Sequence, residues 1–399
     1  MALTLDENGI GLARSYWVQM VRPLLDLELP SVPRIAARIG SGSDVLGLDD
    51  DMSRDHDWGL RLQLLVPSTA RSRVEDVLTR HLPAEFAGHP TRLRFTGQES
   101  PSLTVEVDTL DSLIESRLGF DPRVGGSALD WLSLTGQAVL EFTSGEVFED
   151  SEGQLTGLRS VLSWYPEDVW RYVVASAWQR VDQALPLMGR AGERGDDLGS
   201  RVIAARLVDV AVHLGFLVCR RWAPYSKWRG TVFAQLPLPS QVTGHLASVL
   251  DAPAWPERGE QVLRAVELLA EQQARAGLPT VAPVCTQFWD RPFLHVNPAL
   301  VPAIHDSISD PTVRALPVGA APEPGLEQQL IPDHRLLAVE DGLPGDEDLA
   351  GDGCAGDGAL PGGGWFPVGL LPAGIPALSI GQGGAGLDPA RDHSATARR

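Results

Sequence analysis

The residues with the clearest chemical potential lie in one stretch, residues 40–61, which reads GSGSDVLGLDDDMSRDHDWGLR. Two Gly-Ser pairs, Gly40-Ser41 and Gly42-Ser43, open this stretch, and backbone amides at such turns can bind phosphate groups. Asp55 and Asp57 follow. Two carboxylates at positions i and i+2 of a strand project to the same side and can share divalent metal ions. The stretch therefore predicts a phosphate-binding turn beside a metal-binding pair of aspartates.

Strands are needed to position these acids. An apolar segment, residues 35–39, ends at the Gly-Ser pairs and predicts a short strand. In the strand expected over residues 55–66, the leucines and valine at alternate positions form an apolar face, which leaves both aspartates on the polar face. A later strand, residues 103–110, places Glu106 on a polar face, with Asp108 as an alternative acid on that face. If the two acidic strands are sheet neighbours, three carboxylates converge on one point.

Hydrophobic periodicity divides the chain into three parts. We predict an α+β fold: a domain with a mixed sheet and helices over residues 1–158, an α-helical bundle domain over 159–316, and a disordered Gly/Pro/Asp-rich tail over 317–399. Further elements are expected as follows: helices over residues 8–26, 70–81, 111–117, 166–187, 198–222, 240–250 and 256–276, a strand over 91–96, and a hairpin around 148–155.

Charge and cysteine content narrow the class of protein. The 399 residues carry a net charge of −19, which argues against a general nucleic-acid binder because phosphate backbones require clustered basic surface. The three cysteines are scattered without metal-ligand spacing, which favours a reducing compartment. Neither a signal peptide nor an apolar run of membrane-spanning length is expected. We therefore expect a cytoplasmic protein with no membrane partner.

Lysine usage singles out one position. Lys227 is the single lysine of the chain, and arginine supplies every other fixed positive side chain. A flexible ammonium differs from a planar guanidinium in how it binds an anion. A functional position is favoured over chance retention, although chance is a real alternative.

The Gly-Ser turn followed by Asp-x-Asp resembles the nucleotidyltransferase superfamily of the DNA polymerase β type. Within it the pattern is similar to aminoglycoside adenylyltransferases that modify streptomycin and spectinomycin. The runs GSGSDVLG and SRDHDWG also resemble a bacterial family of uncharacterised proteins. The resemblance extends from the first expected helix to about Pro311. The chain departs from the common pattern in its longer acidic loop, residues 49–53, and in having His56 between the aspartates.

The resemblance implies a role for each part of the site. Gly42-Ser43 would be the phosphate-binding turn, because Gly47 then falls where such enzymes often place a glycine, with Gly40-Ser41 as the alternative. Asp55 and Asp57 would bind Mg²⁺, Glu106 would be the general base, and Lys227 would contact the phosphates of ATP or another nucleoside triphosphate. The implied reaction moves a nucleoside monophosphate onto a hydroxyl of a small molecule and releases pyrophosphate. The favoured nucleotide is AMP, taken from ATP.

Several alternatives stay open. The fold could serve a non-catalytic or regulatory nucleotide-binding protein, or a toxin-like enzyme that modifies tRNA or protein. The aspartates could be solvated strand-end acids, and Glu106 an ordinary polar-face residue. Arg206 and His213 fit the loose Arg-x4-6-His pattern of helical ribonuclease toxins, a pattern that arises easily by chance in an arginine-rich helix.

Overall fold

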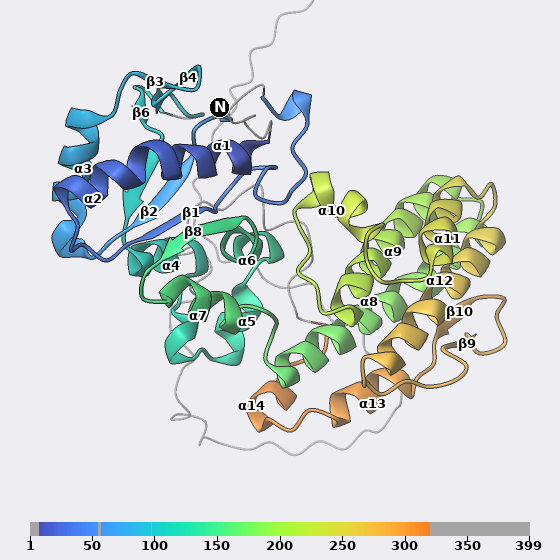
Figure 1. Cartoon of the computed structure of the whole chain (residues 1–399). Coiled ribbons are helices and arrows are strands. Elements are labelled where there is room, and N and C mark those ends of the chain that lie inside the picture. Colours follow the sequence, from blue (N-terminus) through green and yellow to red (C-terminus); the bar gives the residue numbers. More distant parts are fainter. Residues whose placement is uncertain (1–7, 55–56, 97, 320–399) are drawn as a thin grey trace, which may run out of the picture. The chain divides into compact units, whose positions relative to one another are not determined.

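A four-stranded mixed sheet organises the first half of the chain. The computed structural model of the protein describes residues 8–54, 57–96 and 98–319 (Figure 1). The strand order is β7-β2-β1-β8, in which β2 and β7 are parallel and the other neighbours antiparallel. The four strands are β1 (Ile35–Arg38), β2 (Leu62–Leu65), β7 (Val105–Asp108) and β8 (Glu146–Asp150). The strands β2 and β7 are therefore neighbours, which meets the condition set in the sequence analysis for bringing the acidic segments together.

The two faces of the sheet enter two different hydrophobic clusters. The alternating residues Leu60, Leu62, Leu64 and Val66 all join Val105 and Val107 in one cluster, so the apolar face predicted from the sequence is confirmed. Leu65 and Ile35 point into the other, larger cluster. Because side chains alternate along a strand, this division fixes which residues of β2 and β7 can face the site.

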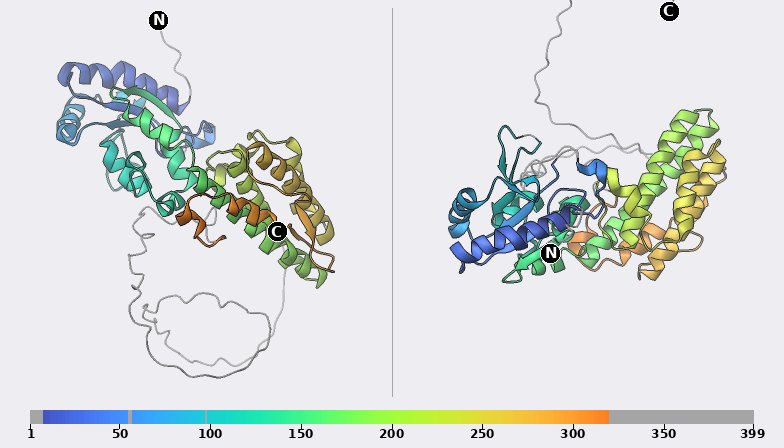
Figure 2. Two further views of the ribbon diagram at one scale, coloured as in Figure 1. Left: turned by 90° about the horizontal axis from the view of Figure 1, so that it is seen from below. Right: turned by 45° about the horizontal axis from the view of Figure 1, so that its top comes forward.

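Helices cover both faces of the sheet (Figures 1 and 2). On the face of the smaller cluster lie α1 (Gly9–Tyr16), a π-helical turn (Trp17–Val21), α2 (Arg22–Glu28) and α3 (Ser68–His81). On the other face lie α4 (Leu110–Leu118), α5 (Ala128–Ser133), α6 (Gly136–Thr143) and α7 (Gln154–Val161). Between these elements are two 3₁₀ turns, Asp51–Arg54 and Pro122–Val124, and the short strands β3 (Glu85–Phe86), β4 (His89–Pro90), β5 (Arg92–Leu93) and β6 (Ser102–Leu103).

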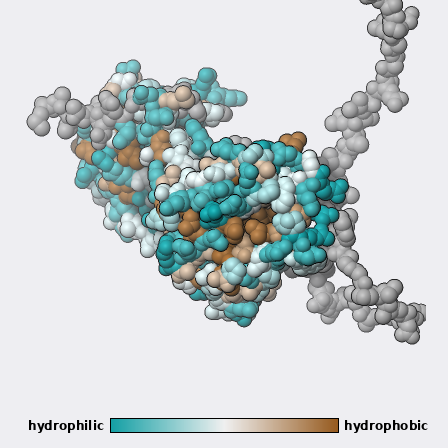
Figure 3. All heavy atoms as spheres, turned by 90° about the vertical axis from the view of Figure 1, so that its right-hand side faces the viewer, coloured by the Kyte–Doolittle hydropathy of each residue, from teal (hydrophilic) through white to brown (hydrophobic). Residues whose placement is uncertain are grey.

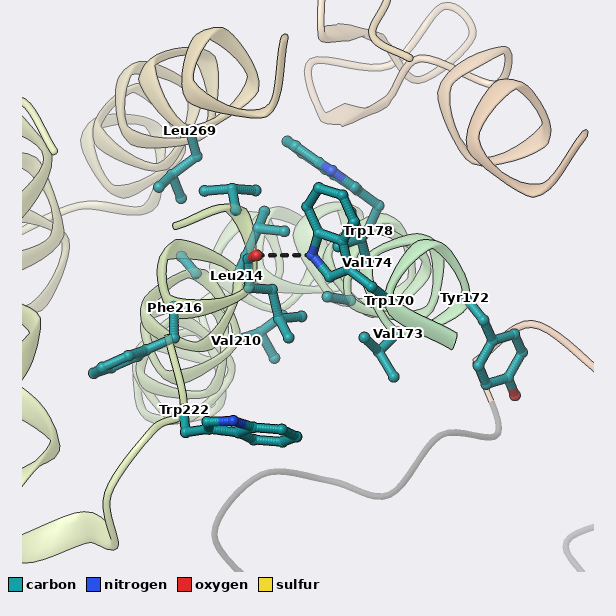
Figure 4. Close-up of a cluster of buried hydrophobic side chains, with 14 of the residues drawn as sticks. Trp170, Tyr172, Val173, Val174, Trp178, Val210, Leu214, Phe216, Trp222 and Leu269 are labelled. Carbon is teal, nitrogen blue, oxygen red and sulfur yellow. Dashed lines mark hydrogen bonds between the residues drawn. The ribbon is translucent and has the colours of Figure 1, made fainter. Parts of the chain in front are cut away.

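The second half is a helical bundle built around one long helix, α8 (Glu167–Glu193). Trp170 and Trp178 on this helix are buried, and the Trp170 indole donates to the Leu217 carbonyl at 2.8 Å, which ties α8 to α9 (Figure 4). The helices are α8 (Glu167–Glu193), α9 (Asp197–Val218), α10 (Ser226–Phe233), α11 (Ser240–Asp251), α12 (Trp255–Arg275), α13 (Leu300–Asp306) and α14 (Pro311–Arg314), with a hairpin of β9 (Cys285–Gln287) and β10 (Leu294–Val296).

The predicted α+β class with a mixed sheet and a helical bundle is confirmed. The described residues fall within one compact unit, residues 1–341. The disordered tail predicted over 317–399 lies outside the described residues from 320 onward. The division at residue 158 stays a prediction.

Three expected elements are wrong. The strand expected over residues 91–96 is only the two-residue strand β5, Arg92–Leu93. The hairpin expected around residues 148–155 is instead the edge strand β8 followed by α7, because residues 146–150 pair with β1 far away in sequence. The strand expected over residues 55–66 begins only at Leu62, as described below.

The surface of the bundle carries an apolar groove. Figure 3 shows apolar side chains gathered among polar ones on the side where α11, α12 and β10 lie. A groove between α8, α12 and residues 292–294 is lined by Met188, Trp255, Leu263 and Phe293. Within the described ranges, no helix has the length and apolar character needed to cross a bilayer.

Candidate active site

The Gly-Ser turn follows β1 directly and presents unused amides. Gly40 and Gly42 have φ values of 86° and 141°, which a residue with a side chain rarely adopts. The Gly40 amide donates to the carbonyl of Glu141 at 2.8 Å, so it is occupied. The amides of residues 41–43 have no acceptor among the residues that the structure describes. The Gly-Ser turn continues into hydrogen-bonded turns over residues 43–47 and not into a helix.

A buried ion pair between Arg38 and Asp44 stabilises the conformation of this turn. The Arg38 guanidinium donates to both oxygens of Asp44, at 2.6 and 2.7 Å, and to the carbonyls of Ile39 and Ser41 at 2.8 and 2.9 Å. Burial lowers the pKa of Arg38, and the negative charge of Asp44 opposes that shift. Both side chains are buried, so their mutual hydrogen bonds compensate for lost hydration.

The Ser41 carbonyl is held from two sides. Besides Arg38, the Arg61 Nη1 donates to it at 3.0 Å. In a trans peptide the C=O and the next N–H point in opposite directions. The two guanidinium groups therefore turn the Gly42 amide away from themselves, and residues 41–43 are exposed or half-buried. This geometry suits anion binding by the turn.

Asp57 reaches the site from a turn and not from a strand. Its φ is 52°, in the left-handed region, and β2 begins five residues later. The alternation argument that placed Asp55 and Asp57 on one strand face is therefore wrong for Asp57. Its Oδ1 accepts a hydrogen bond from the Thr96 amide at 2.8 Å, so the segment before β6 fixes the carboxylate. Asp55 lies outside the described residues.

Glu106 and Asp108 lie on the same face of β7 but have different surroundings. Asp108 pairs with Arg71 at 2.8 Å and accepts from the Thr109 amide at 2.8 Å, so it anchors the start of α4. Glu106 is 44% exposed, and its nearest charged neighbour is Arg61 at 3.6 Å. Of the two acids, Glu106 is the one with oxygens available to a ligand, and it lines a hollow with Gly40 and Ser41.

Arg61 is the functional candidate that the sequence analysis missed. Its guanidinium contacts the Ser41 carbonyl, the Asp57 carbonyl at 3.4 Å and the Glu106 carboxylate at 3.6 Å. It also lies over the Phe95 ring, 5.4 Å from the centroid. Its position on the polar side of the apolar alternation was a signal, but alternation alone does not show which neighbours a side chain meets.

Lys227 lies near the start of α10, and α6 connects that region to the turn. The Tyr225 amide contacts Gln137 Oε1 at 3.4 Å, while Glu141, one turn further along α6, accepts from Gly40. Hydrogen bonds from Ser53 lower the pKa of Asp50, and the positive charge of Lys227 contributes to this shift. Lys227 is thus within electrostatic range of the acidic loop.

The donor chemistry of the site suits a hard cation, although the described residues do not complete a metal site. Within residues 8–54, 57–96 and 98–319, no group of three His, Cys, Asp or Glu side chains is arranged to hold a metal ion. The Glu106 carboxylate and the backbone carbonyl of Asp57 both approach Arg61, whereas the Asp57 carboxylate accepts a hydrogen bond from the Thr96 amide. Carboxylate oxygens are the ligands that Mg²⁺ prefers.

His213 fits the sequence pattern of helical ribonuclease toxins, but its surroundings do not suit a catalytic role. Burial lowers the pKa of His213 to about 3, and the charges of Arg229 and Arg180 add to the shift. Its Nδ1 is buried without a hydrogen-bond partner in the described part of the chain. A neutral, half-buried imidazole whose Nδ1 is enclosed is poorly placed for acid–base chemistry on a substrate.

One segment of the chain is similar to a known protein family. Residues 131–229 match a family model described as "Domain of unknown function (DUF4037)". This segment runs from α5 into α10, so it includes Lys227 and excludes the turn, Asp57 and Glu106. No curated protein matches the chain.

Among solved structures, the chain is similar to a nucleotidyltransferase-like protein from Exiguobacterium sibiricum 255-15, with 12% sequence identity and a TM-score of 0.30. The match covers 67% of this chain and 78% of that one. A TM-score of this size does not define a shared fold, so the residues of the site itself carry the functional argument.

Proposed function

We propose that this protein is a nucleotidyltransferase that moves a nucleoside monophosphate, AMP from ATP in the first instance, onto a hydroxyl of a small molecule. The observation that carries the proposal is the meeting of three parts around Arg61: the Gly-Ser turn, the Asp57 segment and the Glu106 carboxylate. Phosphate binding, metal binding and proton removal are the three requirements of nucleotidyl transfer.

The turn would bind the phosphates. The half-buried Gly42 amide and the amides beside it, which have no acceptor among the described residues, would offer directed donors, and Lys227 would add a flexible positive charge. The net charge of −19 makes these local donors necessary, because the overall field of the protein repels a nucleoside triphosphate. The same acidity disfavours a nucleic-acid acceptor.

Asp55 and Asp57 would hold Mg²⁺. When bound, the ion would neutralise charge that develops on the triphosphate. The hydrogen bond from the Thr96 amide holds Asp57 Oδ1 and leaves Oδ2 as the oxygen that would face the metal. The fixed backbone of Asp57 would therefore determine where the triphosphate sits relative to the turn.

Glu106 would take the proton of the acceptor hydroxyl. The acceptor oxygen would form a bond to the α-phosphorus, the bond from that phosphorus to the bridging oxygen would break, and pyrophosphate would leave. The exposure of Glu106 leaves room for an acceptor beside it, whereas the contacts of Asp108 with Arg71 and Thr109 exclude that acid from the role.

Transfer of labelled nucleotide tests this proposal. The purified protein is incubated with Mg²⁺, a cell extract and each nucleoside triphosphate labelled at the α-phosphate. The expected product is a labelled small molecule. Label on tRNA or protein would support the macromolecular alternative, and absence of any labelled product with all four nucleotides would contradict transfer.

A second candidate function, nucleotide binding without transfer, has one specific observation in its favour. Asp57 lies in a turn with one oxygen already bonded to Thr96, an arrangement less suited to a shared metal than two carboxylates on a strand. Binding of a triphosphate without pyrophosphate release, in the presence of Mg²⁺ and extract, would support this candidate.

A further inference from the structure

We propose that Arg61 is a positioning residue that fixes the phosphate-binding turn, the Asp57 segment and Glu106 relative to one another. This inference rests on the proposed function for its catalytic consequence, but its structural part can be tested without turnover. Arg61 is on the segment that leads into β2, so it belongs neither to the turn nor to β7.

One guanidinium reaches all three parts. Nη1 donates to the Ser41 carbonyl at 3.0 Å and to the Asp57 carbonyl at 3.4 Å, and Nη2 lies 3.6 Å from Glu106 Oε1. Nη2 also contacts Ser41 Oγ at 3.4 Å. A planar group with donors in fixed directions can hold several acceptors at once, whereas an ammonium cannot reproduce that arrangement.

The environment of Arg61 limits its movement. Its side chain is only 13% exposed, against 44% for Glu106, and it lies over Phe95. Its Nε is buried without a hydrogen-bond partner in the described ranges. Leaving a buried donor unpaired has a cost in free energy, so the geometry of this arginine is not optimised for stability alone.

The contact with Glu106, at 3.6 Å and with that carboxylate 44% exposed, adds little to the stability of the fold. An ion pair in which one partner is exposed contributes little to stability. Arg38 already holds the Ser41 carbonyl from within the same segment, at 2.9 Å. What Arg61 adds is the connection between segments that are separate in sequence. We infer that its effect falls on the relative positions of reacting groups, which strongly affect rate.

Arg71 provides a matched control. It also pairs with a carboxylate of β7, Asp108, at 2.8 Å, but within the described chain no hydrogen bond or ion pair joins it to the turn or to Asp57. Arg71 is 45% exposed and lies on α3. Removing Arg71 therefore removes an arginine–carboxylate pair from the same strand without disturbing the site.

The test compares R61Q, R61K and R71Q as full chains. Amide hydrogen exchange of residues 39–44 is measured without ligand, and kcat and KM for the triphosphate are measured in the transfer reaction. We expect both Arg61 variants to exchange faster in the turn and to lose about a hundredfold in kcat with a much smaller change in KM. R71Q should match the wild type, and all variants should keep the wild-type urea midpoint.

Other outcomes separate this inference from the proposed function. Unchanged exchange in R61Q, an effect confined to KM, or equal losses in R71Q would overturn the positioning role. Full rescue by R61K would also overturn it, since a point charge would then suffice. If the wild type transfers no nucleotide, the proposed function fails, and hydrogen exchange alone decides whether Arg61 fixes the turn.

Discussion

The Arg38 guanidinium donates hydrogen bonds to both oxygens of Asp44, at 2.6 and 2.7 Å, and the Gly-Ser turn lies in sequence between these two buried residues. Arg38 ends β1, and Asp44 follows Ser43. The candidate phosphate-binding turn is therefore a loop closed by an ion pair at its base. The shape of the turn depends on charge burial as well as on glycine.

Removing one member of this pair should destabilise the protein. In Arg38→Met the Asp44 carboxylate stays buried without its partner, and we expect a loss of about 3–5 kcal/mol of unfolding free energy in urea. The double variant R38M/D44N replaces the stranded charge with an amide and should recover about 1–3 kcal/mol of that loss. Equal stability of the single and double variants would show that the charge is not the cause.

Gly42 should be less tolerant of a side chain than Gly47. A Cβ at Gly42 would overlap Asp44 Oδ1 and the Arg38 guanidinium, and φ is 141°. At Gly47, φ is 68° and no atom of the described residues lies within 4 Å of the added Cβ. We expect G42A to cost about 2–4 kcal/mol and G47A about 1–2 kcal/mol in urea unfolding. The reverse order would contradict the described packing of the turn.

Glu106 and Asp108 should differ in their effect on transfer. Glu106→Gln removes the proposed base and should lower kcat by about 10²–10⁴. Asp108→Asn weakens the contacts with Arg71 and Thr109, so its effect should fall on stability and leave kcat unchanged. Both variants are compared by kcat at a single pH and by the urea midpoint. A larger loss of kcat in D108N would reassign the base.

Acid should destabilise the bundle through His213. Because its folded pKa is about 3 and the ordinary value is 6.5, the unfolded chain takes up a proton that the folded protein does not. The stability from this group is complete above pH 6.5 and is lost as the pH falls toward 3. Between pH 7 and pH 5.5 the loss from one such group is about 1 kcal/mol. His213→Gln should flatten the slope of stability against pH in that interval, and an unchanged slope would contradict the burial of a neutral imidazole.

The alternation of apolar residues predicted which face of β2 and of β7 is apolar, but not that the two strands pair. Leu62 and Leu64 share a cluster with Val105 and Val107, and the same alternation leaves Glu106 on the opposite face. Where β2 begins was not predictable, since the partner residues across the ladder determine this. The first paired residue is Leu62, and the turn at Asp57 and Gly59, both with positive φ, precedes it.

The arginines of the site were not predictable from periodicity. Arg38 looks like an exposed residue at the end of a strand, but a bidentate partner six residues later allows its burial. The contacts of Arg61 exist only because the fold brings the turn, the Asp57 segment and β7 together. Pattern analysis identified acids and glycines by type, whereas the cations that organise them depend on contacts between distant segments.

The most direct test of the proposed function is pyrophosphate release by the wild type and by Asp57→Asn, measured with Mg²⁺, a nucleoside triphosphate and the acceptor-containing extract. The variant keeps the size of the side chain and an oxygen that can accept from the Thr96 amide, so its unfolding midpoint should match that of the wild type. We predict a fall in rate of at least about a thousandfold, equivalent to ~4 kcal/mol of lost transition-state stabilisation. Pyrophosphate release at the wild-type rate by the folded variant would contradict the account.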